Sequence, residues 1–440
     1  MKIRENSDVL IINVPMDRVL KERKEISKFV SMPPLGDLYI ISYLENAGYR
    51  VSFIDLVVEL FDKSEFIDRL KEINPKIVGF TTYVESWNTQ NMLAKYIKET
   101  FDNVVVVAGG HCASFCYKDM LENRYFEYCI RAEGEKAFLG LCNYYIKEEG
   151  EISDIPNLIY KKNDSVIENP VERIDDIDAL PFPDRSVLDI SKYSYPFTIS
   201  TARGCPGQCI FCSAHAFWGN RIVIRTPEGI MNEIRNVYKN YGLSDFFVVD
   251  DTFTLIPKRV MIFCKMLFEY SNEIGVKFKW GCESRADTVS EDLLKAMKNS
   301  GCNMIQFGME SGNNMILKSI KKRVTYEQVY NAVETSYKVG INTNVSFIIG
   351  HHEDTFETID ETITKAADLK KKFKANVLFS MNTPYPGTEL YNKMKELGVE
   401  LLVNDFSHLS FDKATIRTRN LTNNEIRRLY IHAREVIFGI

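Results

Sequence analysis

Three cysteines stand close together in the stretch "TARGCPGQCIFCSAH", residues 201–215. Cys205, Cys209 and Cys212 have the spacing Cys-x3-Cys-x2-Cys, and thiolates bind soft metals, above all zinc and the iron of iron–sulfur clusters. A structural zinc ion needs four closed ligands, and only His215 stands near enough to complete such a set. On a [4Fe–4S] cluster, three thiolates would leave one iron without a protein ligand, able to bind and reduce a small molecule. The spacing therefore favours a catalytic cluster, with a three-cysteine, one-histidine zinc site as the alternative.

A cysteine loop of this kind needs a rigid framework, and residues 191–390 supply one. Runs of apolar, β-branched residues alternate there with helical patterns, and the loop follows directly on the first run. Six such units without a returning antiparallel segment predict a partial (β/α)6 TIM-like barrel, whose active site lies at the carboxyl ends of the strands. The strands are expected at residues 197–203, 245–251, 277–284, 304–311, 342–350 and 377–384.

Several helix ends in this region are marked in the sequence. Thr325 is expected to be an N-cap, and Thr422 with Glu425 has capping-box spacing at the start of a last helix. The basic run "LKKKFK" at 369–374 fits a solvated helix end better than a binding patch, because lysines there favour the helix dipole. Residues 391–440 are expected to form a short C-terminal helical segment.

Residues 1–145 show the same alternation in shorter units and predict a doubly wound, Rossmann-like domain. Ligands of such sheets bind at the carboxyl ends of the strands. The loops at those ends are "PPLG" (33–36), "TTYVES" (81–86), "GGH" (109–111) and "AEGE" (132–135), in which glycines allow close backbone approach. Residues 146–190 are polar and rich in turn residues, which predicts a domain linker.

The composition is that of a soluble enzyme of two or three domains. The 440 residues are 45% hydrophobic and 26% charged, and the formal net charge of -5 gives no sign of nucleic-acid binding. No apolar run approaches the roughly 18 residues of a membrane helix, and the N-terminus has no signal-peptide layout, so a cytoplasmic location is expected. The other cysteines are interpreted as small buried hydrophobes in a reducing compartment: Cys112, Cys116, Cys129, Cys142, Cys264, Cys282 and Cys302.

The segment "CPGQCIFC" resembles the cysteine motif of the radical S-adenosylmethionine (SAM) superfamily, including the aromatic residue Phe211 before the third cysteine. The likeness extends to "FFVVDDTFT", "WGCESRADTVSEDLLKAMKNSGC", "FGMESGNNMILKSIKKRVTYEQV" and "TPYPGTELY". These blocks look like those of the branch that carries an N-terminal cobalamin (B12)-binding domain. The stretch "PPLGDLYIISYLENAGYRVSFIDL" resembles the opening of that domain. The likeness covers most of residues 30–390 and implies an enzyme similar to class B radical SAM methyltransferases.

The resemblance implies roles for the residues at the barrel strand ends. Cys205, Cys209 and Cys212 would hold a [4Fe–4S] cluster whose open iron chelates SAM, so that reductive cleavage yields a 5′-deoxyadenosyl radical. Asp250 and Asp251 would hold the SAM amino group, with Asp251 favoured because it lies nearer the strand end; the alternative is a helix N-cap pair. The other SAM candidates are Phe211, Arg285, Glu310 and Ser311, for which a structural ion pair (Arg285) and a strand-end cap (Glu310, Ser311) are the alternatives.

The resemblance also implies a cobalamin slot in the first domain. The DxHxxG pattern that supplies a lower axial histidine in many B12 proteins is absent, so His111 is expected near the nucleotide tail and not on cobalt. The alternative is a fold that has lost this ligand. The candidate cobalamin contacts are Pro34, Gly36, Thr81, Ser86, Gly109, Gly110, Gly134 and Glu135.

One segment departs from the family pattern. Where relatives continue the fifth barrel strand through a Gly-x-Pro-Gly-Glu-like turn, this chain reads "GHHEDT". His351 and His352 replace the proline-containing segment, so the turn is expected to differ in shape. The two histidines are candidates for facing the substrate, and the alternative is that they have no chemical role.

The leading hypothesis is a cobalamin-dependent radical SAM enzyme that transfers a methyl group from methylcobalamin to an unactivated carbon. The runner-up is a radical cyclisation, rearrangement or ring contraction without methylation. A methylthiotransferase would need a further cysteine cluster in the first domain, and an iron–sulfur regulatory or electron-transfer module would leave the strand-end residues unexplained. The expected partners are a small-molecule, lipid or peptide substrate and an external electron donor of the flavodoxin or ferredoxin type, with no nucleic acid and no membrane span.

Overall fold

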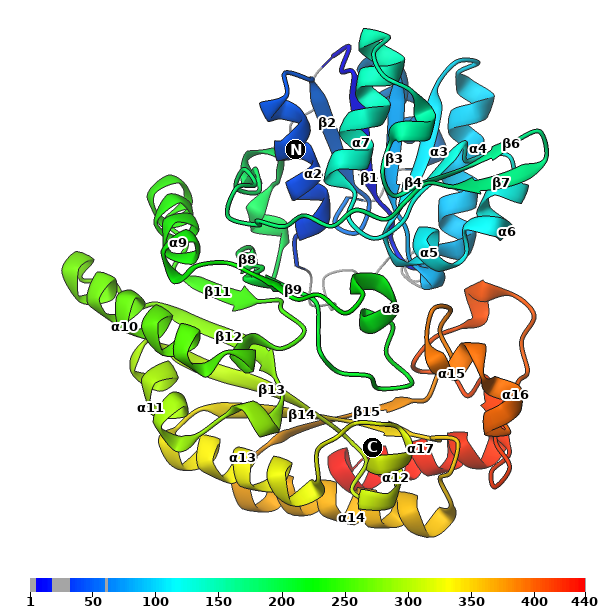
Figure 1. Cartoon of the computed structure of the whole chain (residues 1–440). Helices are drawn as coiled ribbons and strands as arrows, with labels where there is room; N and C mark the ends of the chain where they lie inside the picture. Colours follow the sequence, from blue (N-terminus) through cyan, green and yellow to red (C-terminus); the bar gives the residue numbers. More distant parts are fainter. Residues whose placement is uncertain (1–4, 18–31, 60–61, 440) are drawn as a thin grey trace. The chain divides into compact units, whose positions relative to one another are not determined.

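The computed structural model describes residues 5–17, 32–59 and 62–439 and contains two compact units, Met1–Pro196 and Phe197–Ile440 (Figure 1). Each unit is built on a sheet whose main strands run parallel and alternate with helices along the chain. The boundary at Pro196 lies six residues beyond the end of the predicted linker.

The first unit has one seven-stranded sheet in the order β2-β1-β3-β4-β5-β6-β7. Its strands are β1 (Val9–Asn13), β2 (Val51–Asp55), β3 (Ile77–Thr81), β4 (Val105–Gly109), β5 (Tyr128–Ile130), β6 (Leu158–Lys162) and β7 (Ser165–Glu168). Its helices are α2 (Leu35–Asn46), α3 (Lys63–Ile73), α4 (Trp87–Thr100), α5 (Gly110–Phe115), α6 (Tyr117–Glu122) and α7 (Glu135–Cys142) (Figure 1). The strands β1 to β5 run parallel in a 2-1-3-4-5 order, which confirms the predicted doubly wound fold.

The strands of this sheet are continuously apolar because both of their faces are covered. Every residue of β1 and of β2 is buried. On one face, Val9 and Ile11 share a core cluster with Leu38 of α2 and Phe138 of α7. Leu10, whose side chain points to the other face, is also fully buried. Such runs are typical of parallel strands with helices on both sides.

The predicted linker, residues 146–190, is not a free connection. Its first half forms the hairpin β6–β7, in which β6 pairs antiparallel with β5 and extends the sheet. The amide of Asn169 donates hydrogen bonds of 2.8 Å to the carbonyls of Ile152 and Ile155 and so fixes the hairpin to the preceding turn. The segment reads as a linker because the outer strand β7 is exposed or half-buried throughout, so its sequence is polar.

The second unit has a six-stranded parallel sheet in the order β15-β14-β13-β12-β11-β8. These strands are β8 (Thr198–Ile199), β11 (Asp245–Val248), β12 (Lys279–Ser284), β13 (Cys302–Glu310), β14 (Asn342–Ile349) and β15 (Asn376–Met381). The helices between and after them are α9 (Pro227–Tyr241), α10 (Pro257–Ile274), α11 (Glu291–Asn299), α12 (Asn314–Ser319), α13 (Tyr326–Val339), α14 (Phe356–Phe373) and α17 (Asn423–Phe438) (Figure 1). Within the described part of the chain, β8 and β15 are the sheet edges and do not pair, so this is a partial barrel.

Helices cover one face of this sheet. Phe307 and Met309 of β13, with Val345 and Phe347 of β14, are fully buried in a core cluster with residues of α9, α10, α11, α13 and α14. The residues between them are small or polar, such as Gly308 and Ser346, and are only half-buried. This alternation follows from the period of two along a strand. The side chains that end the strands on the uncovered side are therefore available for ligands.

The first barrel strand is shorter than predicted. The expected strand 197–203 leaves the sheet after β8, and residues Ala202–Arg203 form β9, which pairs antiparallel with β10 (Val223–Ile224). The cause is Asp250, whose carboxylate accepts hydrogen bonds from the backbone N–H groups of Thr201 at 2.6 Å and Ala202 at 3.0 Å. These bonds turn the chain away from the sheet immediately before the cysteine loop.

The predicted helix ends are confirmed. Thr325 caps α13 in a capping box with Gln328, and Thr422 caps α17 in the same way with Glu425. The lysine run ends α14, which stops at Phe373. The C-terminal residues 391–440 form more than one helical segment. Besides α17 they contain the end of α15 (Glu389–Asn392), the helix α16 (Met394–Leu397) and the antiparallel strand pair β16 (Glu400–Leu401) and β17 (Ile416–Arg417).

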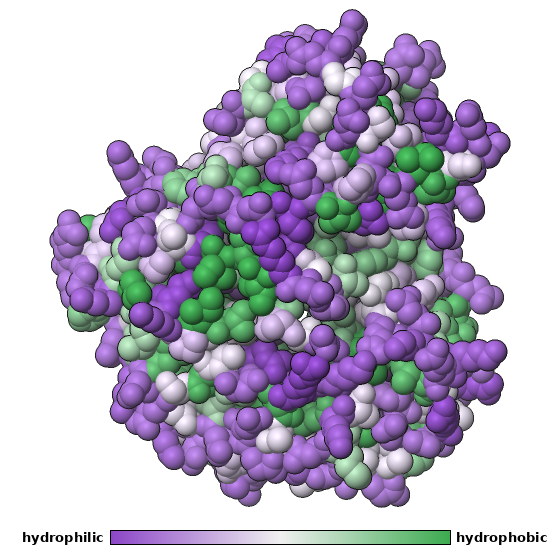
Figure 2. Space-filling model, viewed as in Figure 1, coloured by the Kyte–Doolittle hydropathy of each residue, from purple (hydrophilic) through white to green (hydrophobic). Residues whose placement is uncertain are grey.

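The C-terminal segment belongs to the barrel unit. Ile426 and Ala433 of α17 share a core cluster with Ile349 of β14 and Ile363 of α14. Figure 2 shows a surface on which hydrophilic residues alternate with separate hydrophobic areas. Among the helices that the structure describes, none combines the length and the low charge that a membrane crossing needs.

Candidate functional site

The cysteine loop begins at Gly204, directly after β9. Gly204 has φ of +110°, and a Cβ there would lie 2.9 Å from the carbonyl oxygen of Arg221, so both conformation and space require glycine. Two backbone N–H groups point at sulfur atoms, with Gly207 N 3.3 Å from Cys205 Sγ and Ala214 N 3.5 Å from Cys212 Sγ. Hydrogen bonds of this kind to thiolate sulfurs tune iron–sulfur clusters.

Ile210 anchors the loop between its second and third cysteines. Its N–H donates to the carbonyl of Ile320 at 3.1 Å, and its own carbonyl accepts from the N–H of Leu390 at 2.7 Å. Its side chain is buried in a small apolar cluster with Ile316, Leu317 and Ile320. The loop is therefore fixed at both backbone and side chain, although it has no regular secondary structure of its own.

Two cations lie next to the cysteines. Lys322 pairs with Glu310 at 2.7 Å, and Arg285 donates to the carbonyl of Lys322 at 3.2 Å. Burial raises the pKa of Cys209, while the charges of Lys322 and Arg285 oppose that rise. Burial also raises the pKa of Cys212, to about 12, and nearby acids including Asp251 add to it. The free thiols of Cys209 and Cys212 are thus protonated, and a bound metal must displace those protons.

The donor set fits a cluster that carries net negative charge. Three thiolates bring three negative charges, and the positively charged side chains of Arg285 and Lys322 lie close enough to offset part of them. Among the described residues, no three His, Cys, Asp or Glu side chains gather around one single-ion position.

Gly207 lies between two of the sulfur atoms. A Cβ at this position would lie 3.2 Å from Cys205 Sγ and 3.9 Å from both Cys209 Sγ and Arg285 Nη1. We expect Gly207→Val to reduce cluster loading severalfold, because overpacking of this kind costs about 1–3 kcal/mol. Iron and sulfide content after anaerobic reconstitution measure it. Gln208→Val puts the same side chain on an exposed neighbour and should leave loading unchanged; equal loading in both variants would contradict the prediction.

The two aspartates at the end of β11 have different surroundings. Asp250 is buried, binds the turn at Thr201 and Ala202, and lies 3.8 Å from the guanidinium of Arg259. Asp251 is exposed, accepts a hydrogen bond from the side chain of Trp218, and has a pKa raised to about 6 by partial desolvation and the charge of Asp250. The SAM role of Asp251 stays a prediction, and Asp250 serves the fold of the loop that precedes the cysteines.

The remaining SAM candidates are all engaged with protein groups. Arg285 makes a two-point ion pair with Asp287, at 3.0 and 2.9 Å, besides its bond to Lys322. Glu310 has φ of +68° and forms an ion pair with Lys322. This pair lies over Gly308, because a Cβ on Gly308 would come within 2.8 Å of Lys322 Nζ. Ser311 accepts from the N–H of Asn313 at 3.1 Å at the start of α12. Ser311 has the contacts of a strand-end cap, whereas Arg285 and Glu310 lie beside the cysteine loop.

His351 and His352 are buried, not open to a substrate. His351 is 1% exposed, its ring centroid lies 5.8 Å from that of Phe211, and burial lowers its pKa to about 3 although it bonds to the Glu310 backbone. Asp354 holds the turn by accepting from the N–H groups of Gly350 and His351 at 3.0 and 2.8 Å. His351 therefore supports Phe211 from behind the cysteine loop.

The sequence interpretation missed Lys322 and Thr252. Thr252 Oγ1 lies 3.8 Å from Cys205 Sγ, and Lys322 stands in the pair "KK" after α12. A lysine pair in a polar stretch looks like ordinary surface charge, and only its burial to 11% side-chain exposure distinguishes Lys322 from its neighbour. The hydroxyl of Thr252 follows the two aspartates directly, so it could have been read with them.

In the first unit, the cobalamin candidates lie at the carboxyl ends of the parallel strands. Pro34 stands at the N-cap position of α2, and Gly36 in the first turn of this helix has open space on its Cβ side. Gly110 follows β4 with φ of +90°. The direction of strand order reverses between β1 and β3, which is where doubly wound sheets bind ligands. The other candidates at this edge are Thr81, Ser86, Gly109, Gly134 and Glu135, and exposed His111 lies in the first turn of α5.

An orphaned buried carboxyl at this edge shows that the site fits a ligand. Asp37 in α2 is 1% exposed, and the hydroxyl of Thr81 donates to its Oδ1. Among the described residues, its Oδ2 has no hydrogen-bond partner. Burial, with a smaller contribution from the charge of Asp55, raises the pKa of Asp37 from 3.8 to about 7. A polar ligand at the strand ends would supply the missing partner.

Asp37 makes the stability of the ligand-free chain depend on pH. Because its pKa is raised on folding, the folded state holds a proton that the unfolded chain releases, so stability falls as pH rises from about 4 to about 7 and then levels off. The raised pKa of Asp37 corresponds to a loss of at most about 4 kcal/mol in the free energy of unfolding across this pH range. We expect Asp37→Asn to melt at a higher temperature than the parent at pH 8 and to differ less at pH 5. Asp68→Asn, on the exposed side of α3, is the control, and equal melting shifts at both pH values would contradict the prediction.

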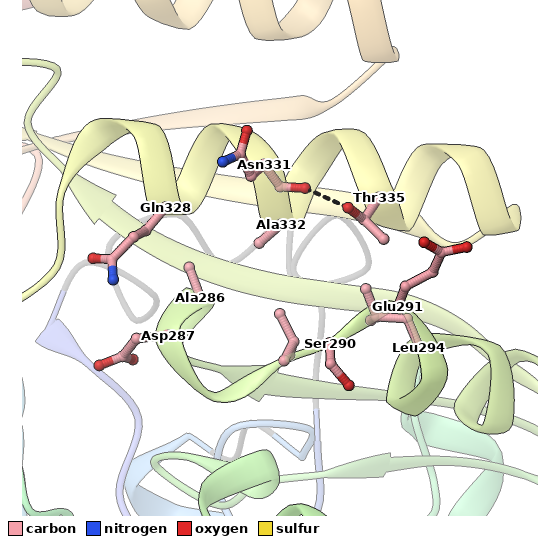
Figure 3. A pocket seen from close by; sticks show the side chains of 10 residues that line it. Ala286, Asp287, Ser290, Glu291, Leu294, Gln328, Asn331, Ala332 and Thr335 are labelled. Atoms are coloured by element: carbon pink, nitrogen blue, oxygen red, sulfur yellow. Dashed lines mark hydrogen bonds between the residues drawn. The ribbon is translucent and has the colours of Figure 1, made fainter.

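A pocket of about 290 Å³ lies away from these residues, on the helix side of the barrel sheet. Figure 3 shows Gln328, Asn331 and Thr335 along α13 on one side of it and Asp287, Ser290 and Glu291 on the other. Asp287 is the residue of this lining that pairs with Arg285. No predicted site residue lines the pocket, so it is not a candidate for the reaction.

A three-cysteine loop at the strand ends of a parallel six-stranded sheet, in one chain with a doubly wound domain, defines a class of enzyme. The profile of the radical SAM superfamily matches residues 199–366, and that of the B12 binding domain matches residues 29–141. The chain belongs to the radical SAM superfamily, among the enzymes with a B12-binding domain. The predicted family, fold class and enzyme class are confirmed, and the predicted cofactors, a [4Fe–4S] cluster, SAM and cobalamin, agree with these two domains.

Similar proteins bear out this membership. The uncharacterized methyltransferase PH0819 of Pyrococcus horikoshii is 32% identical over 90% of this chain and 86% of its own length. The anaerobic magnesium-protoporphyrin IX monomethyl ester cyclase of Cereibacter sphaeroides is 28% identical over 90% of this chain, which spans 65% of that cyclase. The structure of the radical SAM methyltransferase TsrM from Kitasatospora setae, with cobalamin and [4Fe–4S] cluster bound, matches 96% of this chain and 81% of its own, with a TM-score of 0.74 and 17% identity. At that identity the last match shows the fold alone.

Proposed function

We propose that this chain is a cobalamin-dependent radical SAM methyltransferase that methylates an unactivated carbon. The observation that carries the proposal is the cysteine loop, held at the strand ends beside Lys322 and Arg285, in a chain whose other unit has the B12-binding fold. The similarity to a methyltransferase over nine-tenths of the chain supports methyl transfer in particular. The substrate is a small molecule, lipid or peptide, and the electron donor is an external protein of flavodoxin or ferredoxin type in the cytoplasm.

The residues of this chain have distinct tasks in that reaction. Cys205, Cys209 and Cys212 hold the cluster, and Lys322 and Arg285 offset its negative charge. Asp251 holds the ammonium group of SAM through a charge-assisted hydrogen bond. The bound cofactors supply a 5′-deoxyadenosyl radical and a transferable methyl group, while the protein supplies their position and protection from water.

The first unit is proposed to hold cobalamin at the carboxyl ends of β1, β3 and β4. Gly36, with open space on its Cβ side, and Gly109 allow the backbone to approach a large flat ligand, whereas Gly110 is required by its φ of +90° and by the backbone of Thr82 3.0 Å from a Cβ there. His111, on the exposed side of α5, is not proposed as a cobalt ligand. His111→Ala should therefore leave the absorption spectrum of bound hydroxocobalamin unchanged.

The test uses SAM with a deuterated methyl group and the full-length chain reconstituted anaerobically with iron, sulfide and hydroxocobalamin. With a strong reductant, we expect 5′-deoxyadenosine, S-adenosylhomocysteine and a deuterated methyl group on the cobalamin. Formation of 5′-deoxyadenosine without label on cobalamin would contradict methyl transfer. That outcome would favour cyclisation or rearrangement, which the similarity to the Cereibacter sphaeroides cyclase keeps as the second candidate.

A further inference from the structure

Asp37 is an anomaly within the first unit. It stands at the third position of the helix α2, immediately after "PPLG", and its side chain is buried although a carboxylate is costly to bury. Thr81 occupies one of its oxygens. The other, Oδ2, has no partner among the described residues. Buried polar atoms nearly always have a hydrogen-bond partner, so an open one calls for an explanation.

The ionisable groups around Asp37 do not provide that explanation. Asp55 of β2 raises the pKa of Asp37, and Tyr83 and Tyr193 feel its charge in turn. All three are acids, so none compensates a carboxylate. With a pKa of about 7, Asp37 is present in both protonation states near neutral pH, and in either state Oδ2 can take part in a further hydrogen bond.

Asp55, the neighbouring carboxyl at the same edge, shows what a purely structural carboxyl looks like in this fold. Its Oδ1 accepts from the amide of Asn13 and from the N–H of Val57, both at 2.9 Å. Its Oδ2 accepts from the hydroxyl of Tyr193 at 2.6 Å. Both of its oxygens are thus satisfied by protein. Asp37, by contrast, has a partner for its Oδ1 only, and its Oδ2 has none among the described residues.

The location of that open position is specific. Helix α2 follows β1, and Thr81 ends β3, so the bond between Asp37 and Thr81 spans the point at which the strand order reverses. Doubly wound sheets bind their ligands in the crevice at this point. Three predicted cobalamin contacts, Pro34, Gly36 and Thr81, stand within three residues of Asp37 or touch it.

We propose that Asp37 binds cobalamin directly, with its Oδ2 hydrogen-bonded to a carboxamide side chain of the corrin ring. The inference rests on the proposed function, in which the first unit holds cobalamin. A primary carboxamide carries both an acceptor oxygen and donor N–H groups. It can therefore accept from the protonated carboxyl or donate to the carboxylate, which suits a group that is present in both states at neutral pH.

The test compares Asp37→Leu with Asp37→Asn in the full-length chain, titrated with hydroxocobalamin and followed by absorbance and equilibrium dialysis. We expect Asp37→Leu to bind hydroxocobalamin roughly tenfold to a hundredfold more weakly, because it leaves the carboxamide without its partner. Asp37→Asn keeps an acceptor and donors at this place and should stay within about threefold of the parent. Asp55→Asn is the matched control: it should lower the melting temperature and leave the affinity unchanged.

The outcomes separate this inference from the function on which it rests. If the parent chain does not bind hydroxocobalamin, the proposed function of the first unit is wrong. If the parent binds and a folded Asp37→Leu chain, verified by circular dichroism and melting, binds equally well, Asp37 does not contact the ligand. Cobinamide, which keeps the ring carboxamides and lacks the nucleotide tail, must show the same loss with Asp37→Leu. A loss confined to hydroxocobalamin would assign Asp37 to the tail and overturn the carboxamide contact.

Discussion

A chain in which Cys209 is replaced by alanine is expected to hold no stable iron–sulfur cluster and to form no 5′-deoxyadenosine from SAM. The loop has three thiols for a cluster. Its other neighbours include the cations Lys322 and Arg285, the carboxylates Glu310 and Asp251 and apolar side chains, none of which is a usual ligand of an iron–sulfur cluster. Removing one thiolate from three leaves two, and clusters of this kind are held by cysteine thiolates. Iron, acid-labile sulfide and visible absorbance after anaerobic reconstitution measure the loss, and 5′-deoxyadenosine by chromatography measures the activity.

Two further variants make the result specific. Cys264→Ala removes a cysteine from the helix α10, where it is 2% exposed in the barrel core, and should keep full iron and sulfide content. His215→Ala removes the histidine of the zinc alternative and should also keep the cluster. Parental iron and sulfide in Cys209→Ala would refute the assignment, and loss of metal in His215→Ala would favour zinc.

The order of the helices and strands could be predicted because the burial of parallel strands shows directly in the hydrophobic pattern of the sequence. Strands covered on both faces are continuously apolar, as in the "VLIIN" of β1, and each is followed by a helical pattern. The same regularity places strand ends next to loops, so the candidates at residues 81, 109 and 310 could be found without coordinates. The cysteine motif then adds a chemical signal that does not depend on the fold.

The elements that were mispredicted are those that tertiary hydrogen bonds decide. The turn after β8 depends on Asp250, which is 49 residues away in the sequence from Thr201. The hairpin β6–β7 is polar because its outer side is exposed, and nothing in its composition distinguishes it from a linker. Local patterns do not record such contacts.

The same limit applies to the site. Lys322, whose side chain is 11% exposed, and buried Asp37 are two charged groups at the candidate sites that the sequence interpretation did not single out, and each looks like a surface residue in its local stretch. The reverse holds for His351 and His352, which look like loop residues in the sequence but are both buried, His351 with its ring against that of Phe211. Burial of a polar side chain is a property of the packed structure, so it is the observation that coordinates add.

Opposite consequences are expected from replacing the two adjacent aspartates at the end of β11. Asp251→Ala should weaken SAM binding roughly tenfold to a hundredfold, because a charge-assisted hydrogen bond to an ammonium is worth about 1.5–3 kcal/mol. Its cluster content should equal that of the parent, because Asp251 is exposed and accepts a hydrogen bond from the side chain of Trp218, not from the cysteine loop. Asp251→Asn keeps an acceptor for Trp218 without the charge, so it should lose nearly as much affinity as the alanine variant.

Asp250→Ala should instead damage the fold around the cluster. It would leave the buried guanidinium of Arg259 without its carboxylate, a change that costs about 3–5 kcal/mol, and would free the N–H groups of Thr201 and Ala202. We therefore expect a lower melting temperature and reduced iron content, with SAM affinity per loaded cluster close to that of the parent. Melting, iron content and SAM titration on the same preparations distinguish the two effects. If Asp251→Ala binds and cleaves SAM like the parent, SAM does not lie against β11, and if Asp250→Ala melts like the parent, the turn into the cysteine loop does not depend on that carboxylate.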